Sequence, residues 1–198
     1  ALNSNTTASN NTAVGYQAAY SNVTGTSLVA VGWKSLEANT TTGNTAVGMN
    51  SARATTTGAD NSAIGHDALR YNTTGGFNTV LGKQALFNNT TASYNTAVGY
   101  QAAYSNTTGQ FNTNVGYRAG YSNATGIENT IVGYEAGYYN TSSNNTFVGR
   151  RSGHTNTTGQ YNTGHGQSSL FGNTTGSYNA ALGYQALNAN TTASNNTA

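Results

Sequence analysis

The sequence predicts an all-β protein, a parallel β-solenoid (β-roll) of eleven coils with about 17 residues each. Two observations predict this fold class: a repeat of nearly constant length runs through the whole chain, and each copy carries a short β-forming segment followed by glycine. The glycines that mark the repeat, called anchor glycines below, are Gly15, Gly32, Gly48, Gly65, Gly82, Gly99, Gly116, Gly133, Gly149, Gly166 and Gly183. Consecutive anchor glycines are 17 residues apart, except for two intervals of 16 residues.

Each copy has the pattern of a strand followed by turns. The commonest segment before the anchor is Thr-Ala-Val, and β-branched residues flanked by Gly and Asn favour a strand of a few residues. The later segment Asn-Thr-Thr-Gly is typical of a turn, because Asn and Gly tolerate positive φ and Asn can bond its own backbone. A helix is disfavoured because Gly, Asn and Thr are poor helix formers and no apolar stripe recurs at helical spacing.

Large aliphatic residues directly before the anchor glycines predict the core. Ten of eleven copies have one there, so we expect this position to point inward. The predicted core residues are Val14, Val31, Val47, Ile64, Leu81, Val98, Val115, Val132, Val148 and Leu182, and His165 is the exception. The residue three after the anchor is always Ala or Ser, which predicts a tight corner or a close backbone approach.

Asparagine recurs at two further positions, four before and seven after the anchor, in ten of eleven copies each. Leu28 and Thr55 are the two exceptions. If each copy forms one coil, like residues stack about 4.8 Å apart. Asn above Asn then forms a ladder of amide hydrogen bonds.

Charged and aromatic residues also predict stacking in register. Two after the anchor, consecutive copies carry Arg118, Glu135 and Arg151, which would form a ladder of alternating charge. The residues five after the anchor in another run of consecutive copies are Phe87, Tyr104, Tyr121 and Tyr138. Cross-strand pairs of opposite charge and of aromatic rings are each favourable by about 0.2–1 kcal/mol.

Composition narrows the class of protein. The chain has 12 charged residues among 198, a net charge of +2 and no Pro or Cys. The basic residues are scattered, so we expect no nucleic-acid partner. No apolar run approaches the roughly 20 residues that span a bilayer, so we expect no membrane insertion.

The two ends of the chain repeat each other. Residues 1–13 match residues 186–198 at twelve of thirteen positions. Solenoids are normally closed by capping repeats, and neither end has one. We therefore expect residues 1–198 to form a single repeat array, uncapped at both ends, that is a window of a longer fibre.

The repeat resembles two known families. The motif Asn-Thr-Ala-Val-Gly, at residues 11–15 and 95–99, resembles the head repeats of trimeric autotransporter adhesins. The longer stretch 95–109 is similar to repeats of phage tail-fibre shafts. The resemblance covers all eleven copies and implies a homotrimeric β-roll that serves as a shaft or an adhesive head. A small core also favours oligomerisation, since three chains around one axis would bury the aliphatic position.

No arrangement of catalytic or metal-binding residues is apparent in the sequence. His66, His154 and His165 occupy three different positions of the repeat, so stacking does not gather them. The five acidic residues form no paired-carboxylate pattern, and the glycines are periodic turn residues rather than a phosphate-binding loop. We expect no enzymatic activity, no cofactor and no metal.

Asn-x-Thr sequons at the predicted turn are candidate sites of N-glycosylation. They include Asn22, Asn72, Asn106, Asn123, Asn156 and Asn173. The alternative interpretation is turn chemistry in a chain rich in Asn and Thr.

These observations together predict a structural shaft or adhesive segment of an extracellular fibre, on a cell surface or a virion. Its partners would be further copies of itself and a cell-surface or glycan receptor. One alternative is a subunit of a self-assembling extracellular filament, built from single-chain solenoids. Another is an ice-binding β-solenoid, because Thr residues eight and nine after the anchor would form a regular hydroxyl array.

Overall fold

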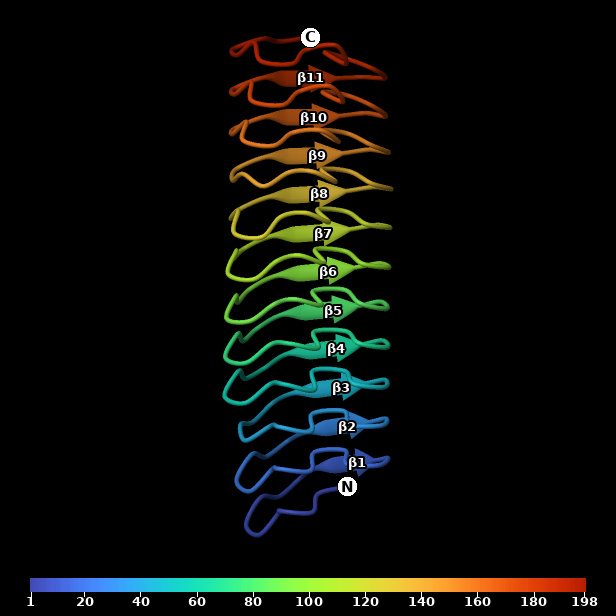
Figure 1. Cartoon of the computed structure of the whole chain (residues 1–198), viewed down its shortest axis with the longest axis vertical. Helices are drawn as coiled ribbons and strands as arrows, with labels where there is room; N and C mark the ends of the chain where they lie inside the picture. The colour runs from blue at the N-terminus through green and yellow to red at the C-terminus, as the bar shows by residue number, and fades with distance from the viewer.

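The computed structural model describes all 198 residues and contains eleven strands of three residues each and no helix. The strands are β1 (Thr12–Val14), β2 (Val29–Val31), β3 (Thr45–Val47), β4 (Ser62–Ile64), β5 (Thr79–Leu81), β6 (Thr96–Val98), β7 (Thr113–Val115), β8 (Thr130–Val132), β9 (Thr146–Val148), β10 (Thr163–His165) and β11 (Ala180–Leu182). They form one parallel sheet in sequence order. The coils stack into a straight rod with the two termini at opposite ends (Figure 1). The predicted parallel β-solenoid is confirmed.

Strand register follows the repeat, including its two shorter intervals. Val98 pairs with Val115 across a 17-residue coil, and Val31 pairs with Val47 across a 16-residue coil. In both cases the residue directly before one anchor glycine lies beside its counterpart in the next copy. A shorter interval therefore lacks a residue in the turns and leaves the sheet undisturbed.

Hydrogen bonds between coils continue well beyond the strands. Of 125 backbone–backbone hydrogen bonds, 20 lie within the strands. In the returning half of the coil, the amide of Leu86 donates to the carbonyl of Ala102, and that of Thr73 donates to Thr90. Most of each coil is thus paired with its neighbours, so that a coil with a very thin core still satisfies its backbone polar groups.

The anchor glycines are required by both conformation and space. Their φ angles lie between 124° and 139°, a range that L-residues rarely adopt. A Cβ added at Gly48 would lie 2.5 Å from the carbonyl oxygen of Gly65 in the next coil. Each anchor glycine therefore allows the chain to turn out of the strand while the coils remain in contact.

The core is formed by residues on both halves of the coil. Middle residues of the strands are buried and face residues three and four after the anchor, such as Ala85 and Leu86 opposite Val80. The position that is always Ala or Ser is buried, which confirms the predicted close approach. The hydroxyls of Ser35, Ser51 and Ser152 at this position bond a strand carbonyl: Ser35 Oγ donates to the carbonyl of Ala46 at 2.9 Å.

The prediction that the residues directly before the anchor form the core is wrong. Because side chains alternate along a strand, burial of the middle residue turns both of its neighbours outward. The predicted core residues that lie outside are Val14, Val31, Val47, Ile64, Leu81, Val98, Val115, Val132, Val148 and Leu182. The prediction assumed that the larger aliphatic residue of Thr-Ala-Val is the inner one, whereas the thin interior takes the small alanine.

Two buried asparagine columns connect the coils, and the predicted amide ladders are confirmed. In the column four before the anchor, Asn78 Nδ2 donates to Asn61 Oδ1 at 3.0 Å. In the column seven after it, Asn89 Nδ2 donates to Asn72 Oδ1 at 2.8 Å. Both columns also donate to turn carbonyls, since Asn61 and Asn72 both bond the oxygen of Gly75. The asparagine side chains therefore fix the turns and the spacing of the coils together.

The Asn-Thr-Thr-Gly segment forms a turn whose Asn side chain bonds its own backbone. Asn72 Nδ2 donates to the carbonyl of Gly75 at 2.8 Å. Positive φ, however, occurs elsewhere in the coil: at the anchor, and at residues such as Lys34, Leu36 and Tyr94. The expected turn is present, but its Asn and Gly do not supply the left-handed backbone.

Candidate functional site

The most extended feature of the surface is a row of aliphatic side chains on the outer face of the sheet. We call it the aliphatic stripe; it consists of the ten outward residues named above. Ile64 is 43% exposed and Leu81 48%, and the other members in the middle of the rod are half-buried. The stripe is continuous because the parallel strands are in register, so successive members are direct strand partners. His165 interrupts it only near the C-terminal end.

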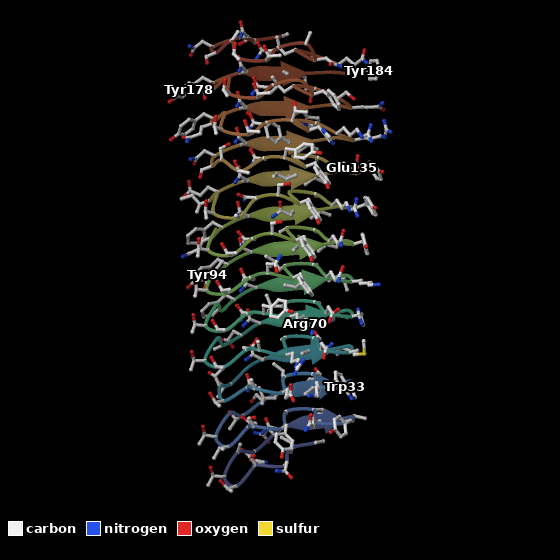
Figure 2. The ribbon with its side chains drawn as sticks, in the orientation of Figure 1. Trp33, Arg70, Tyr94, Glu135, Tyr178 and Tyr184 are labelled. Carbon is white, nitrogen blue, oxygen red and sulfur yellow. The ribbon has the colours of Figure 1, made fainter.

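Aromatic rings and Thr hydroxyls border the stripe. Directly after the anchor glycines, Tyr100, Tyr117 and Tyr134 stack with ring centroids 5.4 and 5.1 Å apart. The first residue of most strands is Thr, on the same face as the stripe. Trp33 and Tyr184, which also follow anchor glycines, lie at one narrow edge of the rod (Figure 2). The sheet face is therefore apolar along its centre and amphipathic along its borders.

A second aromatic row runs along the returning half of the coil, and we call it the aromatic column. Its members, five after the anchor, are Phe87, Tyr104, Tyr121, Tyr138, His154 and Phe171. Their rings stack at centroid distances of 5.0–5.5 Å, as the sequence predicts for the first four. The column confirms the register independently of the backbone.

The predicted charge ladder forms in part. Arg151 Nε lies 2.8 Å from Glu135 Oε2 in the previous coil. Arg118 instead donates to Gln101 Oε1 at 2.9 Å and lies over the rings of Tyr117 and Tyr121. The aromatic surroundings thus provide Arg118 with an alternative to the carboxylate.

Burial shifts the pKa values of three side chains in the aromatic column. Desolvation raises the pKa of the Tyr104 and Tyr138 hydroxyls, so that both remain neutral well above neutral pH. Desolvation also lowers the pKa of His154, and the positive charge of Arg151 acts in the same direction against the opposing effect of Glu135. His154 is therefore neutral at pH 7 and packs as a ring between Tyr138 and Phe171.

A third aromatic row, five before the anchor, was not anticipated from the sequence. Phe77, Tyr94 and Phe111 stack at 5.0 and 5.2 Å while remaining about half exposed. Tyr94 and Tyr178 lie at the edge of the rod opposite Trp33 and Tyr184 (Figure 2). All five aromatic residues of this row have φ near 58°, a left-handed conformation that costs a non-glycine residue about 1–2 kcal/mol. Their recurrence at a fixed offset was the available signal.

The structure does not support the candidate glycosylation sites. Asn22, Asn72, Asn106, Asn123, Asn156 and Asn173 are at most 1% exposed. The Nδ2 atom of each, which would carry the glycan, donates to a turn carbonyl at 2.8–3.0 Å. A glycan has no space at this position of the folded coil, so these residues belong to the ladder and not to a modified surface.

Only part of the Thr array predicted for ice binding is exposed to solvent. The hydroxyls eight after the anchor mostly donate to the next coil, as Thr73 Oγ1 does to the carbonyl of Thr90 at 2.9 Å. The Thr residues nine after the anchor, such as Thr74 and Thr108, remain exposed. The regular exposed hydroxyls therefore form single rows rather than the expected double row.

The three histidines lie apart, in the row directly after the anchor, in the aromatic column and in the aliphatic stripe. His66 Nδ1 is 3.3 Å from Asp67 Oδ2, and Asp67 also pairs with Arg70. No group of three His, Cys, Asp or Glu side chains could hold a metal ion. No helix able to cross a membrane is present.

Comparison of the chain with protein-family models, curated proteins and solved structures finds no match. The proposed function therefore rests on the surfaces of the rod described above.

Proposed function

We propose that the chain is a non-enzymatic structural shaft or adhesive segment of an extracellular fibre, in which three copies pack their aliphatic stripes against one another. The observation that carries the proposal is the stripe itself. A continuous row of aliphatic side chains along most of a rod is a candidate association surface. A surface of constant chemistry along a straight rod suits lengthwise packing against an identical rod.

Burial of the stripe side chains contributes free energy that favours association. Complete burial of a Val or Leu side chain contributes about 1.5–3 kcal/mol, so covering the exposed part of each stripe residue contributes about 1 kcal/mol. Ten such residues contribute about 10 kcal/mol per chain, which is of the same size as the cost of association, estimated at about 4–15 kcal/mol, so most of the stripe must be covered. A parallel bundle satisfies this condition because it covers the stripe along its whole length.

Light scattering on the purified chain tests the proposal, and the expected result is a mass three times that of one chain. Val98→Asp with Val115→Asp places two charges in the middle of the stripe and should reduce the mass to that of a monomer. Thr108→Asp with Thr125→Asp adds the same charges in adjacent coils at exposed positions away from the stripe, and should leave the trimer intact. A wild-type monomer, or a trimer that is indifferent to the stripe variant, would contradict the proposal.

The same face favours one second candidate, an ice-binding solenoid. Most strands present Thr and an aliphatic side chain outward, two residues apart, and repeat them every coil. If the chain is monomeric, this regular face remains free and thermal hysteresis should be measurable. Large particles of variable length would instead support the filament subunit.

A further inference from the structure

One part of the aromatic column is replaced by charged residues, and a cavity lies there. In three consecutive coils the position five after the anchor is Glu37, Arg53 and Arg70 instead of an aromatic residue. The next position is Ala38 and Ala54 in the first two of these coils. These residues and Tyr71 line a cavity of about 360 Å³, the only one in the molecule. Arg70 is labelled in Figure 2.

The two arginines are held by carboxylates in different directions. Arg53 Nε lies 2.5 Å from Glu37 Oε2 in the previous coil, and Lys34 Nζ lies 2.9 Å from Glu37 Oε1. Arg70 Nη1 bonds Asp67 Oδ1 of its own coil at 3.0 Å. Each guanidinium therefore uses one of its five N–H donors in these pairs. The cavity opens between two side chains that turn toward different partners.

The residues that line the cavity have unused hydrogen-bond donors and a net positive charge. Two arginines and one glutamate give the lining residues a net charge of +1. Arg70 Nε is buried and has no hydrogen-bond partner, which is costly for a charged donor. Burial by itself would raise the pKa of Glu37, but hydrogen bonds and charges from Lys34 and Arg53 outweigh it and lower that pKa. Glu37 is therefore ionised at neutral pH and acts only as an acceptor.

Aromatic rings complete the wall of the cavity. The guanidinium of Arg70 lies 5.3 Å from the ring centroid of Tyr71 and 5.9 Å from that of Phe87, which holds its plane in place. Tyr71 packs edge-on against Phe87 and is 45% exposed. An exposed ring beside charged groups offers an apolar surface to the C–H face of a sugar.

We propose that this cavity binds the carboxylate of an acidic saccharide, such as a uronic-acid unit of a polysaccharide. Free N–H groups of Arg53 and Arg70 would take the carboxylate, because a planar guanidinium matches its two oxygens. Glu37 would accept from a sugar hydroxyl, and Tyr71 would lie against the ring. The volume suits a small ligand of this size. The cavity lies on the returning half of the coil and not on the stripe face, so binding does not depend on trimer formation.

Calorimetric titration at low salt with a short oligomer of galacturonic acid tests the proposal. Binding is expected to the acid and to be at least tenfold weaker to its methyl ester, which keeps the sugar and removes the charge. Acetate and inorganic phosphate, as separate probes, should bind at least tenfold more weakly than the oligomer. Equal binding of acetate or phosphate would overturn the sugar assignment, and no preference for the acid over its ester would overturn the carboxylate assignment.

Variants localise the site. Arg53→Gln and Arg70→Gln should each weaken binding of the oligomer at least tenfold, and Arg70→Lys should restore it only in part because lysine lacks the planar fork. Lys83→Gln is the matched control, since it removes one positive charge from an exposed side chain in the adjacent coil. Circular dichroism of each variant checks that the fold is retained. If a folded Arg70→Gln binds as well as the wild type, the cavity is not the site.

Discussion

The two parts of the rod fill the same narrow interior in opposite ways. In the first core cluster the strands contribute small residues and the returning half contributes large ones, as with Ala63 facing Leu69. In the second cluster β8 and β9 contribute Ile131 and Phe147, with glycines opposite, whereas the last two coils again place Leu170 and Leu187 in the returning half. The comparison indicates that most coils have room for about one large side chain, supplied by either half, although the coil of β5 holds both Val80 and Leu86.

The junction between the clusters supports the same interpretation. Asn114 occupies the middle of β7 and is 1% exposed, with Gly120 opposite it. A Cβ added at Gly120 would overlap the amide of Asn114, as one added at Gly153 would overlap the ring of Phe147. Glycine thus appears in the returning half wherever the strand residue extends across the core.

The largest effect is expected from substitutions at β9 that change how the strand and the returning half share the core volume. Phe147→Ala leaves a cavity and should lower the free energy of unfolding by about 3–5 kcal/mol. Gly153→Leu alone should also destabilise, because the new side chain overlaps the ring. The double variant should recover most of the loss, since Leu69 and Leu86 already adopt positive φ at the same position. Denaturant unfolding measures all three, and additive losses would disprove the compensation.

A smaller effect, equal in both parts, is expected in the asparagine ladder. Asn78 lies in the first part and Asn162 in the second, and each is bonded to the coils on both sides. Replacement of either by Ala leaves buried partners unpaired and should cost about 1–3 kcal/mol. Asn88→Ala is the control, because this half-buried side chain makes no hydrogen bond in the structure. Clearly unequal losses at the two sites would show that the ladder depends on how the core is filled.

The smallest effect is a pH dependence confined to the second part. The folded pKa of His154 is lowered, so the folded state binds its proton less readily than the unfolded chain does. Its contribution to stability is therefore complete above the ordinary histidine pKa of about 6.5 and is lost as the pH falls through the folded value. Melting temperatures at about pH 7.5 and pH 5 should differ by a few degrees.

His154→Phe should reduce that difference, because Phe171 shows that a phenyl ring fits the next position of the column. The carboxyl and cationic groups near His154 are those of Glu135 and Arg151. An unchanged difference in the variant would assign the pH dependence to other groups.

Much of the fold could be predicted from the sequence because every coil repeats the same local chemistry. The anchor glycines predicted the strand positions, and the recurrence of Asn predicted ladders that the structure contains. The sequence predicted the wrong side of the sheet for the aliphatic residue. A Thr-Ala-Val strand can bury either its middle residue or the two residues beside it, and packing against the returning half of the coil decides which. The sequence left the sequons open between glycosylation and turn chemistry, because Asn-Thr-Thr-Gly does not distinguish an exposed Asn from one whose amide bonds its own turn.

By itself the sequence determined the coil length, the parallel stacking and the register, because a constant repeat places each residue beside its own counterpart. Only the tertiary structure decided which residues are inside. Burial depends on where the chain returns after the anchor glycine, and it leaves Val outside, Asn inside and a cavity between Arg53 and Arg70. The physical reason is volume: the narrow interior of most coils holds about one large side chain, and either half of the coil can supply it.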